Sequence, residues 1–253
     1  MLRSNGTMSE PLSQAWSSFR LIGGVAALLA ALVFRRWLSA EFGMFQSLGW
    51  IQKQATPSTP LEWFSLLQTN KFVGLLLLNV FDIVNYLLAA LMYLGIYSLL
   101  RSHDKAYMRF AMFLTAIGTA IYLPSNQATN ILSLSNQYFA SVTDVQKQLI
   151  LAAGQYALTI NDPVTFGTGV FWGYMFFYAA GFILSIGILR NGPITKWIAV
   201  VGIIANAFGL IYFVTSFFGP SLSIIPALGT APLNLVWYIA IGIQLLRHMK
   251  TEA

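Results

Sequence analysis

The stretch from Phe72 to Leu100, FVGLLLLNVFDIVNYLLAALMYLGIYSLL, decides the fold of this chain. It contains no proline and a single formal charge, Asp82. As one α-helix at ~1.5 Å per residue it would be about 43 Å long, more than the ~30 Å hydrocarbon core of a bilayer. The stretch therefore predicts a membrane-spanning helix over 72–100 that carries one acid.

The acid needs protein or water around it, because inserting a bare charge at the centre of a bilayer costs about 2.5–3.5 kcal/mol. At about 100° per residue, Asn79, Asn85 and Tyr86 lie within about 60° of Asp82 around the helix. Most other positions of the stretch are apolar. We therefore expect this polar stripe to face other helices or a wet cavity, with lipid on the opposite side of the helix.

The composition identifies the class of protein. Hydrophobic residues make up 57% of the 253 residues and charged residues only 9%, whereas soluble domains have about 25% charged residues. The chain is predicted to be an integral membrane protein whose main partner is the lipid bilayer. Its net charge of +6 forms no basic run, so we expect no nucleic-acid partner. Because cysteine is absent, disulfides and thiolate metal sites are excluded.

The apolar segments predict an all-α, polytopic membrane helical bundle of six transmembrane helices in a single membrane domain, 1–253. The expected spans are approximately 16–38, 72–100, 107–123, 166–189, 197–217 and 232–246. Before the last span, the stretch 219–232 holds Pro220, Pro226 and Pro232. This pattern favours a loop leading into a short helix over a broken helix that enters the membrane.

Between the third and fourth spans, the region 125–161 is too polar to cross a bilayer. Helical spacing continues there, since Asn126, Asn130, Ser133 and Gln137 share one side of a helix. A second helix is expected to start near Thr143. We therefore predict an extracytoplasmic helical segment packed over the mouth of the bundle.

The distribution of lysine and arginine predicts the orientation. These residues are more frequent in the segments that share a side with the two termini, and cytoplasmic segments carry the excess of positive charge. Both termini are therefore expected in the cytoplasm. Asp82 would then lie in the outer half of the membrane, on the same side as 125–161, beneath a pocket that opens outward.

Several segments are similar to a known family; they are Ser135-Asn-Gln-Tyr-Phe-Ala-Ser-Val-Thr-Asp144, Leu151-Ala-Ala-Gly154, Phe176-Phe-Tyr-Ala-Ala-Gly181 and Leu189-Arg-Asn-Gly-Pro193. The chain resembles the bacterial membrane-protein family catalogued as domain of unknown function 4386, from Arg20 to its end. The resemblance implies a multi-pass protein of the bacterial cytoplasmic (inner) membrane. It brings no catalytic or ligand-binding residue with it.

Asp82 is the central candidate for function. It would anchor a small apolar or cationic ligand in a pocket used for binding, sensing or transport. The expected ligand-binding residues are Asp82, Asn79, Asn85, Tyr86, Asn126, Asn130, Asn206 and Asn234. Alternatively, Asp82 is a packing residue hydrogen-bonded to Asn206 or Asn234 on neighbouring helices.

Two other function classes stay open, and no cofactor or metal site is expected. The only histidines, His103 and His248, fall at the ends of apolar segments, so no pair can hold a haem. As a membrane-embedded enzyme, the chain would use Asp82 as general acid on a lipophilic substrate, together with a second acid such as Asp144 or Asp162. As a structural or accessory subunit, it would form a homo-oligomer through Gly169-x-x-x-Gly173.

Overall fold

The computed structural model describes residues 10–41, 57–102, 105–191 and 193–250, and these ranges contain helices and no strand. Six helical stretches are long and apolar enough to cross a membrane; they are Trp16–Val33, Val80–Leu100, Lys105–Ala140, Gly169–Arg190, Lys196–Phe218 and Leu222–His248. The protein is thus the all-α, multi-pass membrane protein that its hydropathy predicts.

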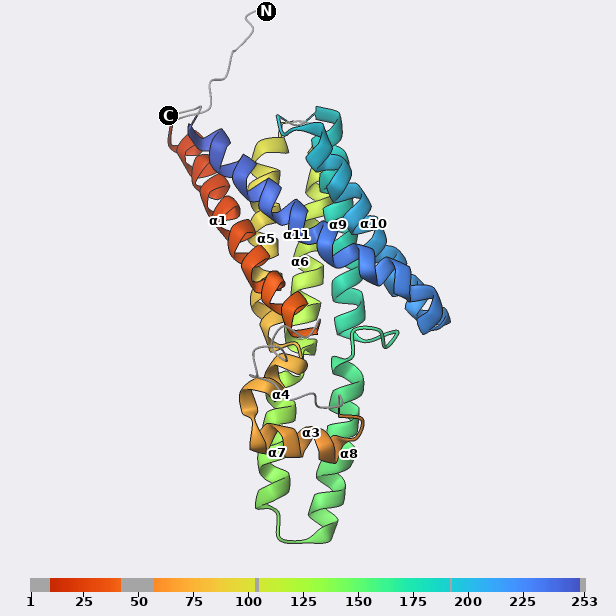
Figure 1. Cartoon of the computed structure of the whole chain (residues 1–253). Coiled ribbons are helices and arrows are strands. Elements are labelled where there is room, and N and C mark those ends of the chain that lie inside the picture. Colours follow the sequence, from red (N-terminus) through yellow and green to blue (C-terminus); the bar gives the residue numbers. More distant parts are fainter. Residues whose placement is uncertain (1–9, 42–56, 103–104, 192, 251–253) are drawn as a thin grey trace, which may run out of the picture.

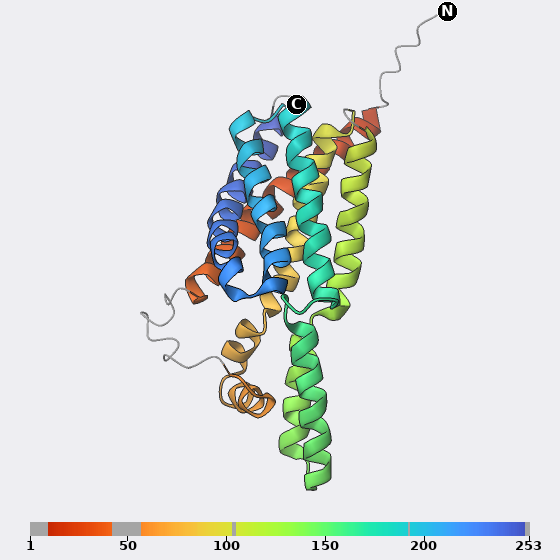
Figure 2. The ribbon, with the colours of Figure 1, turned by 90° about the vertical axis from the view of Figure 1, so that its right-hand side faces the viewer.

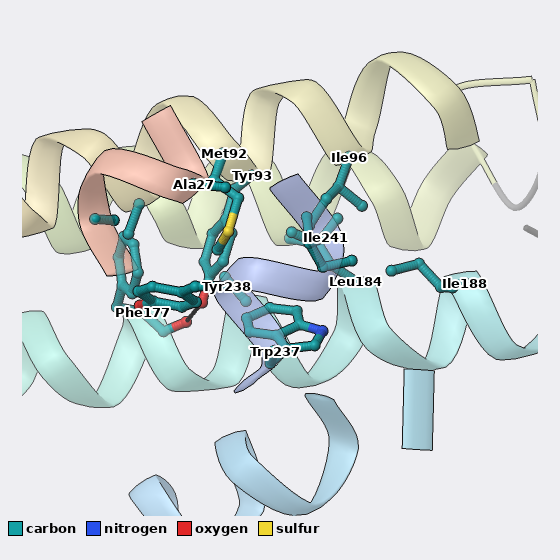
Figure 3. Packing of buried hydrophobic residues seen from close by; sticks show 14 of the residues in the cluster. Ala27, Met92, Tyr93, Ile96, Phe177, Leu184, Ile188, Trp237, Tyr238 and Ile241 are labelled. Atoms are coloured by element: carbon teal, nitrogen blue, oxygen red, sulfur yellow. Dashed lines mark hydrogen bonds between the residues drawn. The ribbon is translucent and has the colours of Figure 1, made fainter. Parts of the chain in front are cut away.

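The main bundle consists of three sequential antiparallel hairpins (Figure 1). They are α1 (Glu10–Glu41) with α5 (Val80–Leu100), α6 (Lys105–Ser125) with α9 (Gly169–Asn191), and α10 (Lys196–Phe218) with α11 (Pro220–Lys250). Further contacts of α1 with α11, α9 with α10 and α5 with α6 join the hairpins into a ring. Its interior is filled by large side chains from different helices, among them Tyr93, Leu184 and Trp237 (Figure 3).

The first hairpin depends on two glycines that bring the backbones of α1 and α5 together. A Cβ atom on Gly23 would lie 2.7 Å from the Cα atom of Gly95. Ala27 and Ala31 continue the same small-residue face and are buried. Small residues of this kind allow the close helix packing that is typical of membrane bundles.

Four shorter helices form a second layer at one end of the bundle. They are α3 (Pro60–Thr69), α4 (Lys71–Leu77), α7 (Ala128–Ala140) and α8 (Asp144–Asn161). These helices share a hydrophobic core separate from that of the bundle, the second core, which includes Phe64, Leu67 and Ile131. The α7–α8 hairpin projects from the end of the bundle opposite the start of α1 (Figures 1 and 2). The region 125–161 is therefore helical, as its spacing predicts.

The short helix α3 begins with a capping box. Glu62 accepts hydrogen bonds from the backbone N–H groups of Ser58 at 2.7 Å and Thr59 at 3.2 Å, and its own N–H donates to the Thr59 hydroxyl. Hydrogen bonds to the ionised form favour it, so the contacts with Ser58 and Thr59 lower the pKa of Glu62. The box places the start of α3 above the second core.

Two predictions about helix continuity are wrong. The helix expected over 72–100 is interrupted, because α4 ends at Leu77 and α5 starts at Val80, with Asn79 between them at φ 61° and ψ 33°. This left-handed conformation is one that asparagine tolerates better than most residues.

The opposite error concerns 219–232, where a loop was expected. The structure has one helix, α11, from Pro220 onward, with Pro226 and Pro232 inside it. Only Gly219, at φ 134°, breaks the chain after α10. The prolines remove the N–H groups that would bond the carbonyls of Leu222 and Leu228, and the Thr230 hydroxyl donates to the Pro226 carbonyl one turn before it at 2.7 Å.

Candidate functional site

The site is built on the interruption between α4 and α5. The Leu78 carbonyl accepts a hydrogen bond from Asn161 Nδ2 at 3.1 Å, and the Asn79 carbonyl accepts one from Asn126 Nδ2 at 3.2 Å. Two asparagines from the second layer thus bind the backbone at the break, where the Asn79 carbonyl also accepts a hydrogen bond from the Asp82 N–H at 3.1 Å. As a result α5 starts at a defined position, and Asp82 stands in its first turn.

Asp82 is hydrogen-bonded across the bundle to α9. The Tyr174 hydroxyl donates to Asp82 Oδ2 at 2.5 Å. Tyr122 of α6 packs edge-on against Tyr174, and Asn126 Nδ2 donates to the Tyr122 hydroxyl at 3.3 Å. Since Asn126 also donates to the Asn79 carbonyl, Tyr122 lies between the helix break and the tyrosine that binds the acid.

Aromatic rings surround these hydrogen bonds. Tyr86 stacks on Tyr122 with ring centroids 4.2 Å apart and an interplanar angle of 6°. Its hydroxyl donates to the Gly173 carbonyl at 2.5 Å. Tyr174 stands edge-on to Tyr122 at 5.2 Å and is stacked at 5.3 Å on Phe213 of α10. The cluster joins four of the six long helices around one acid.

The Asp82 carboxylate also interacts electrostatically with Tyr178 of α9 and Tyr238 of α11. One turn along α5, the side-chain oxygen of Asn85 is buried and has no hydrogen-bond partner among the described residues. A buried acceptor without a partner costs about 1–3 kcal/mol. It is therefore a position where a ligand that donates a hydrogen bond would be stabilised.

The structure brings together five of the residues singled out from the sequence: Asp82, Asn79, Asn85, Tyr86 and Asn126. The other three make their described hydrogen bonds elsewhere. Asn130 is exposed and donates to Gln127 at 2.7 Å. Asn206 is fully buried against Tyr93, and Asn234 donates to the Thr230 carbonyl within its own helix.

Sequence reasoning missed the two residues that hold the site most directly, Tyr174 and Asn161. Tyr174 is one of several aromatic residues on α9, and helical spacing alone does not say which of them faces Asp82. Asn161 sits at the end of a polar helix, where its amide resembles any helix-terminal side chain. Asn161 stands out only in the structure, where 7% of its surface is exposed.

The candidate second acids do not join Asp82. Both carboxylate oxygens of Asp162 are occupied locally, accepting from the Val164 N–H at 3.1 Å and the Thr165 hydroxyl at 2.9 Å. Asp144 begins the 18-residue helix α8 at the tip of the hairpin, about 27 Å along the helix from its bundle end. Neither acid supports the acid pair that the enzymatic alternative requires.

Metal ligands and the glycine motif are also accounted for. Within 10–41, 57–102, 105–191 and 193–250, no group of three or more His, Cys, Asp or Glu side chains could hold a metal ion; His103 lies outside these ranges. A Cβ atom on Gly173 would meet Tyr122 Cβ at 2.8 Å, and one on Gly169 would meet the Ser125 side chain. The motif therefore packs α9 against α6 within the chain, and its part in a dimer stays a prediction.

Comparison with known proteins identifies the family. No curated protein and no solved structure matches the chain significantly. The family described as "Domain of unknown function (DUF4386)" matches residues 65–248, which include α5 to α10, most of α11 and the whole cluster around Asp82. The match extends over well over half of the sequence, and the chain therefore belongs to the DUF4386 family.

Proposed function

We propose that this protein binds a small cationic molecule at Asp82, through a pocket that opens on the side of the α7–α8 hairpin, and that it acts as a sensor or permease. The observation that carries the proposal is the hydrogen bond of Tyr174 to Asp82, at 2.5 Å, inside an aromatic cluster of the membrane bundle. A ligand cation would place a positive charge beside an acid inside the membrane bundle, where the surroundings screen the attraction between the two charges less than water does.

Aromatic side chains at the helix ends support a shallow position for the site. Trp197, which is 53% exposed, and Phe217, which is 60% exposed, lie near opposite ends of α10, about 30 Å apart at ~1.5 Å per residue. This matches the ~30 Å hydrocarbon thickness, and aromatic residues favour both interfaces. Trp172, at the Phe217 end, precedes Tyr174 by about 3 Å along α9. Asp82 would then lie just inside the hydrocarbon, within reach of water and of a ligand.

The chemistry of the cluster favours a cation with an apolar body. A carboxylate attracts positive charge, and tyrosine rings attract cations to their faces. Asn85 adds an acceptor oxygen without a partner, which suits an ammonium group that donates a hydrogen bond. Rings of Tyr86, Tyr122 and Phe213 would contact the apolar part of the ligand.

The charges at the two ends of the bundle support an orientation with both termini in the cytoplasm of a bacterial inner membrane. Exposed cations gather at the end where α1 starts and α11 finishes; they are Lys105, Arg109, Arg190, Lys196 and Arg247. At the other end are Lys71 and Lys147, and the last turns of α1 carry Arg35 and Arg36. Cytoplasmic segments carry the positive excess, so the hairpin would be extracytoplasmic and the pocket would open outward.

The experiment compares binding of butylammonium, whose N–H groups can donate to Asn85, and of tetraphenylphosphonium, which has no donor, to the purified protein in lipid nanodiscs. Asp82→Asn keeps the shape of the side chain and removes its charge, so affinity should fall by on the order of tenfold or more. Asp144→Asn, which removes an exposed acid at the hairpin tip, is the matched control and should bind normally. If wild type and Asp82→Asn bind these cations equally, or if Asp82→Leu is more stable and equally active, Asp82 is a packing residue.

A further inference from the structure

Helix α8 carries an apolar stripe on the face turned away from the rest of the protein. Val145 is 68% exposed, Leu149 67% and Tyr156 69%, and Ala152 between them is exposed as well. The opposite side of α8 is engaged, because Gly154 contacts the Phe64 ring and Ala157 belongs to the second core. The stripe is thus a second, separate apolar face of a helix that is already packed on one side.

The spacing of the stripe is that of a coiled coil. Val145, Leu149, Ala152 and Tyr156 follow one another at intervals of four, three and four residues, which is the a/d pattern of a heptad repeat. The positions beside the stripe are uncharged, with Gln146, Gln148 and Gln155 among them. Glutamine amides both donate and accept hydrogen bonds. The flanks therefore complement an identical helix without repulsion between like charges.

The position of the hairpin argues for a protein partner in place of lipid. Phe166 is 58% exposed and contacts Phe217 at 5.1 Å, and this pair belongs to the aromatic side chains at the proposed membrane surface. From there the 18-residue α8 extends away from the bundle, over about 27 Å. With the membrane surface proposed above, acyl chains would not reach this region, and the stripe of a monomer would be left in water.

Membrane insertion also determines how two copies can meet. The hairpin continues the direction of the bundle in both views (Figures 1 and 2). Two copies in one bilayer share the same orientation, so a two-fold axis between them runs along the membrane normal. Such an axis brings the two α8 helices together parallel and in register. Leu149 would face Leu149 of the second copy, and Tyr156 would face Tyr156.

We propose that α8 forms a parallel two-stranded coiled coil with α8 of a second copy of this chain, and that the protein is a dimer in the membrane. The seam is shorter than the three to four heptads that identify a stable coiled coil on sequence alone. Confinement of both bundles to one bilayer makes up for this, because it aligns the helices and raises their effective concentration. The interface lies outside the Asp82 cluster, so it does not depend on the proposed ligand.

The absence of cysteine from the chain makes a cross-linking test direct. Tyr156→Cys and Leu149→Cys are each reconstituted in liposomes at low protein density and oxidised. Both should form disulfide-linked dimers at a rate on the order of tenfold above that of Ser133→Cys, because the effective concentration inside a dimer far exceeds that of random encounters. Ser133 is the matched control, since it is exposed on α7 and lies off the seam.

A second variant keeps the test independent of misfolding. Leu149→Glu places a charge in the seam at an exposed position, so the monomer should fold with unchanged helicity. In combination with Tyr156→Cys it should lower cross-linking to the rate of Ser133→Cys. The proposal is overturned if Tyr156→Cys and Ser133→Cys cross-link equally, or if Leu149→Glu leaves the cross-linking rate unchanged.

Discussion

Asn161 is the most informative residue to replace, because it connects three parts of the fold. Its Nδ2 group donates to the Leu78 carbonyl at 3.1 Å, and its Oδ1 atom accepts from the Gln127 N–H at 2.7 Å. Asn161→Ala leaves both backbone groups without these partners. Each buried group that loses its hydrogen bond costs about 1–3 kcal/mol. Because Gln127 is only partly buried, water will recover part of its loss, and we expect the free energy of unfolding to fall by about 2–4 kcal/mol.

Reversible unfolding in mixed micelles, followed by circular dichroism, measures this difference. Asn130→Ala is the matched control, because Asn130 also makes a 2.7 Å hydrogen bond next to the same loop but is exposed. Its loss should change the free energy of unfolding by less than about 0.5 kcal/mol. Should Asn161→Ala prove as mild as Asn130→Ala, the two hydrogen bonds do not stabilise the break between α4 and α5.

Three further outcomes follow from the contacts. Gly95→Ala places a Cβ atom 2.9 Å from Gly23 Cα, so α1 and α5 must separate; thermal unfolding should show a loss of about 1–3 kcal/mol, and an unchanged midpoint would contradict this packing. Tyr174→Phe removes the hydrogen bond to Asp82 and should weaken tetraphenylphosphonium binding less than Asp82→Asn does, as measured by titration; equal losses would mean that Tyr174 itself contacts the ligand. The capping box of α3 should loosen in acid, because the pKa of Glu62 is lowered from its ordinary 4.5. The stabilisation of α3 by the ionised Glu62 side chain is complete above pH 4.5 and is lost as the pH falls through the lowered pKa. Hydrogen exchange of α3 amides would reveal this, and Glu62→Gln should abolish the pH dependence.

The sequence predicts the six long helices and the polar hairpin well, because hydropathy and helical spacing are local properties of the chain. It fails at Asn79, where a single asparagine in a leucine-rich stretch looks like part of a helix. The break depends on Asn126 and Asn161, which come from segments distant in the sequence. The helix propensity of residues 72–100 therefore does not predict it. At Pro226 the sequence predicts a break where the structure has a continuous helix. Proline predicts a helix end, but α11 packs along α10 and stays helical through both prolines.

The candidate site is predictable only as far as one helix determines it. The helical wheel of α5 correctly groups Asp82 with Tyr86, since both belong to the cluster shared with α9. It cannot identify Tyr174, because the rotation of α9 about its axis is set by packing against α6. The sequence also cannot show which helix a glycine motif contacts. Gly169 and Gly173 make a helix-packing face, as expected, but the partner helix belongs to the same chain.

The break at Asn79 and the acid at Asp82 explain one another. A carboxylate in the middle of a 72–100 helix would require about 2.5–3.5 kcal/mol and a cationic partner. Because α5 starts at Val80, Asp82 instead stands at a helix N-terminus, where the unpaired N–H groups and the helix dipole stabilise a negative charge by about 0.3–1 kcal/mol and up to ~2 kcal/mol when partly buried. The hydrogen bond from Tyr174 adds about 1.5–3 kcal/mol for a charged acceptor. Together these contributions are of the same size as the insertion cost, so the helix break and Tyr174 account for much of what makes an acid tolerable at this position.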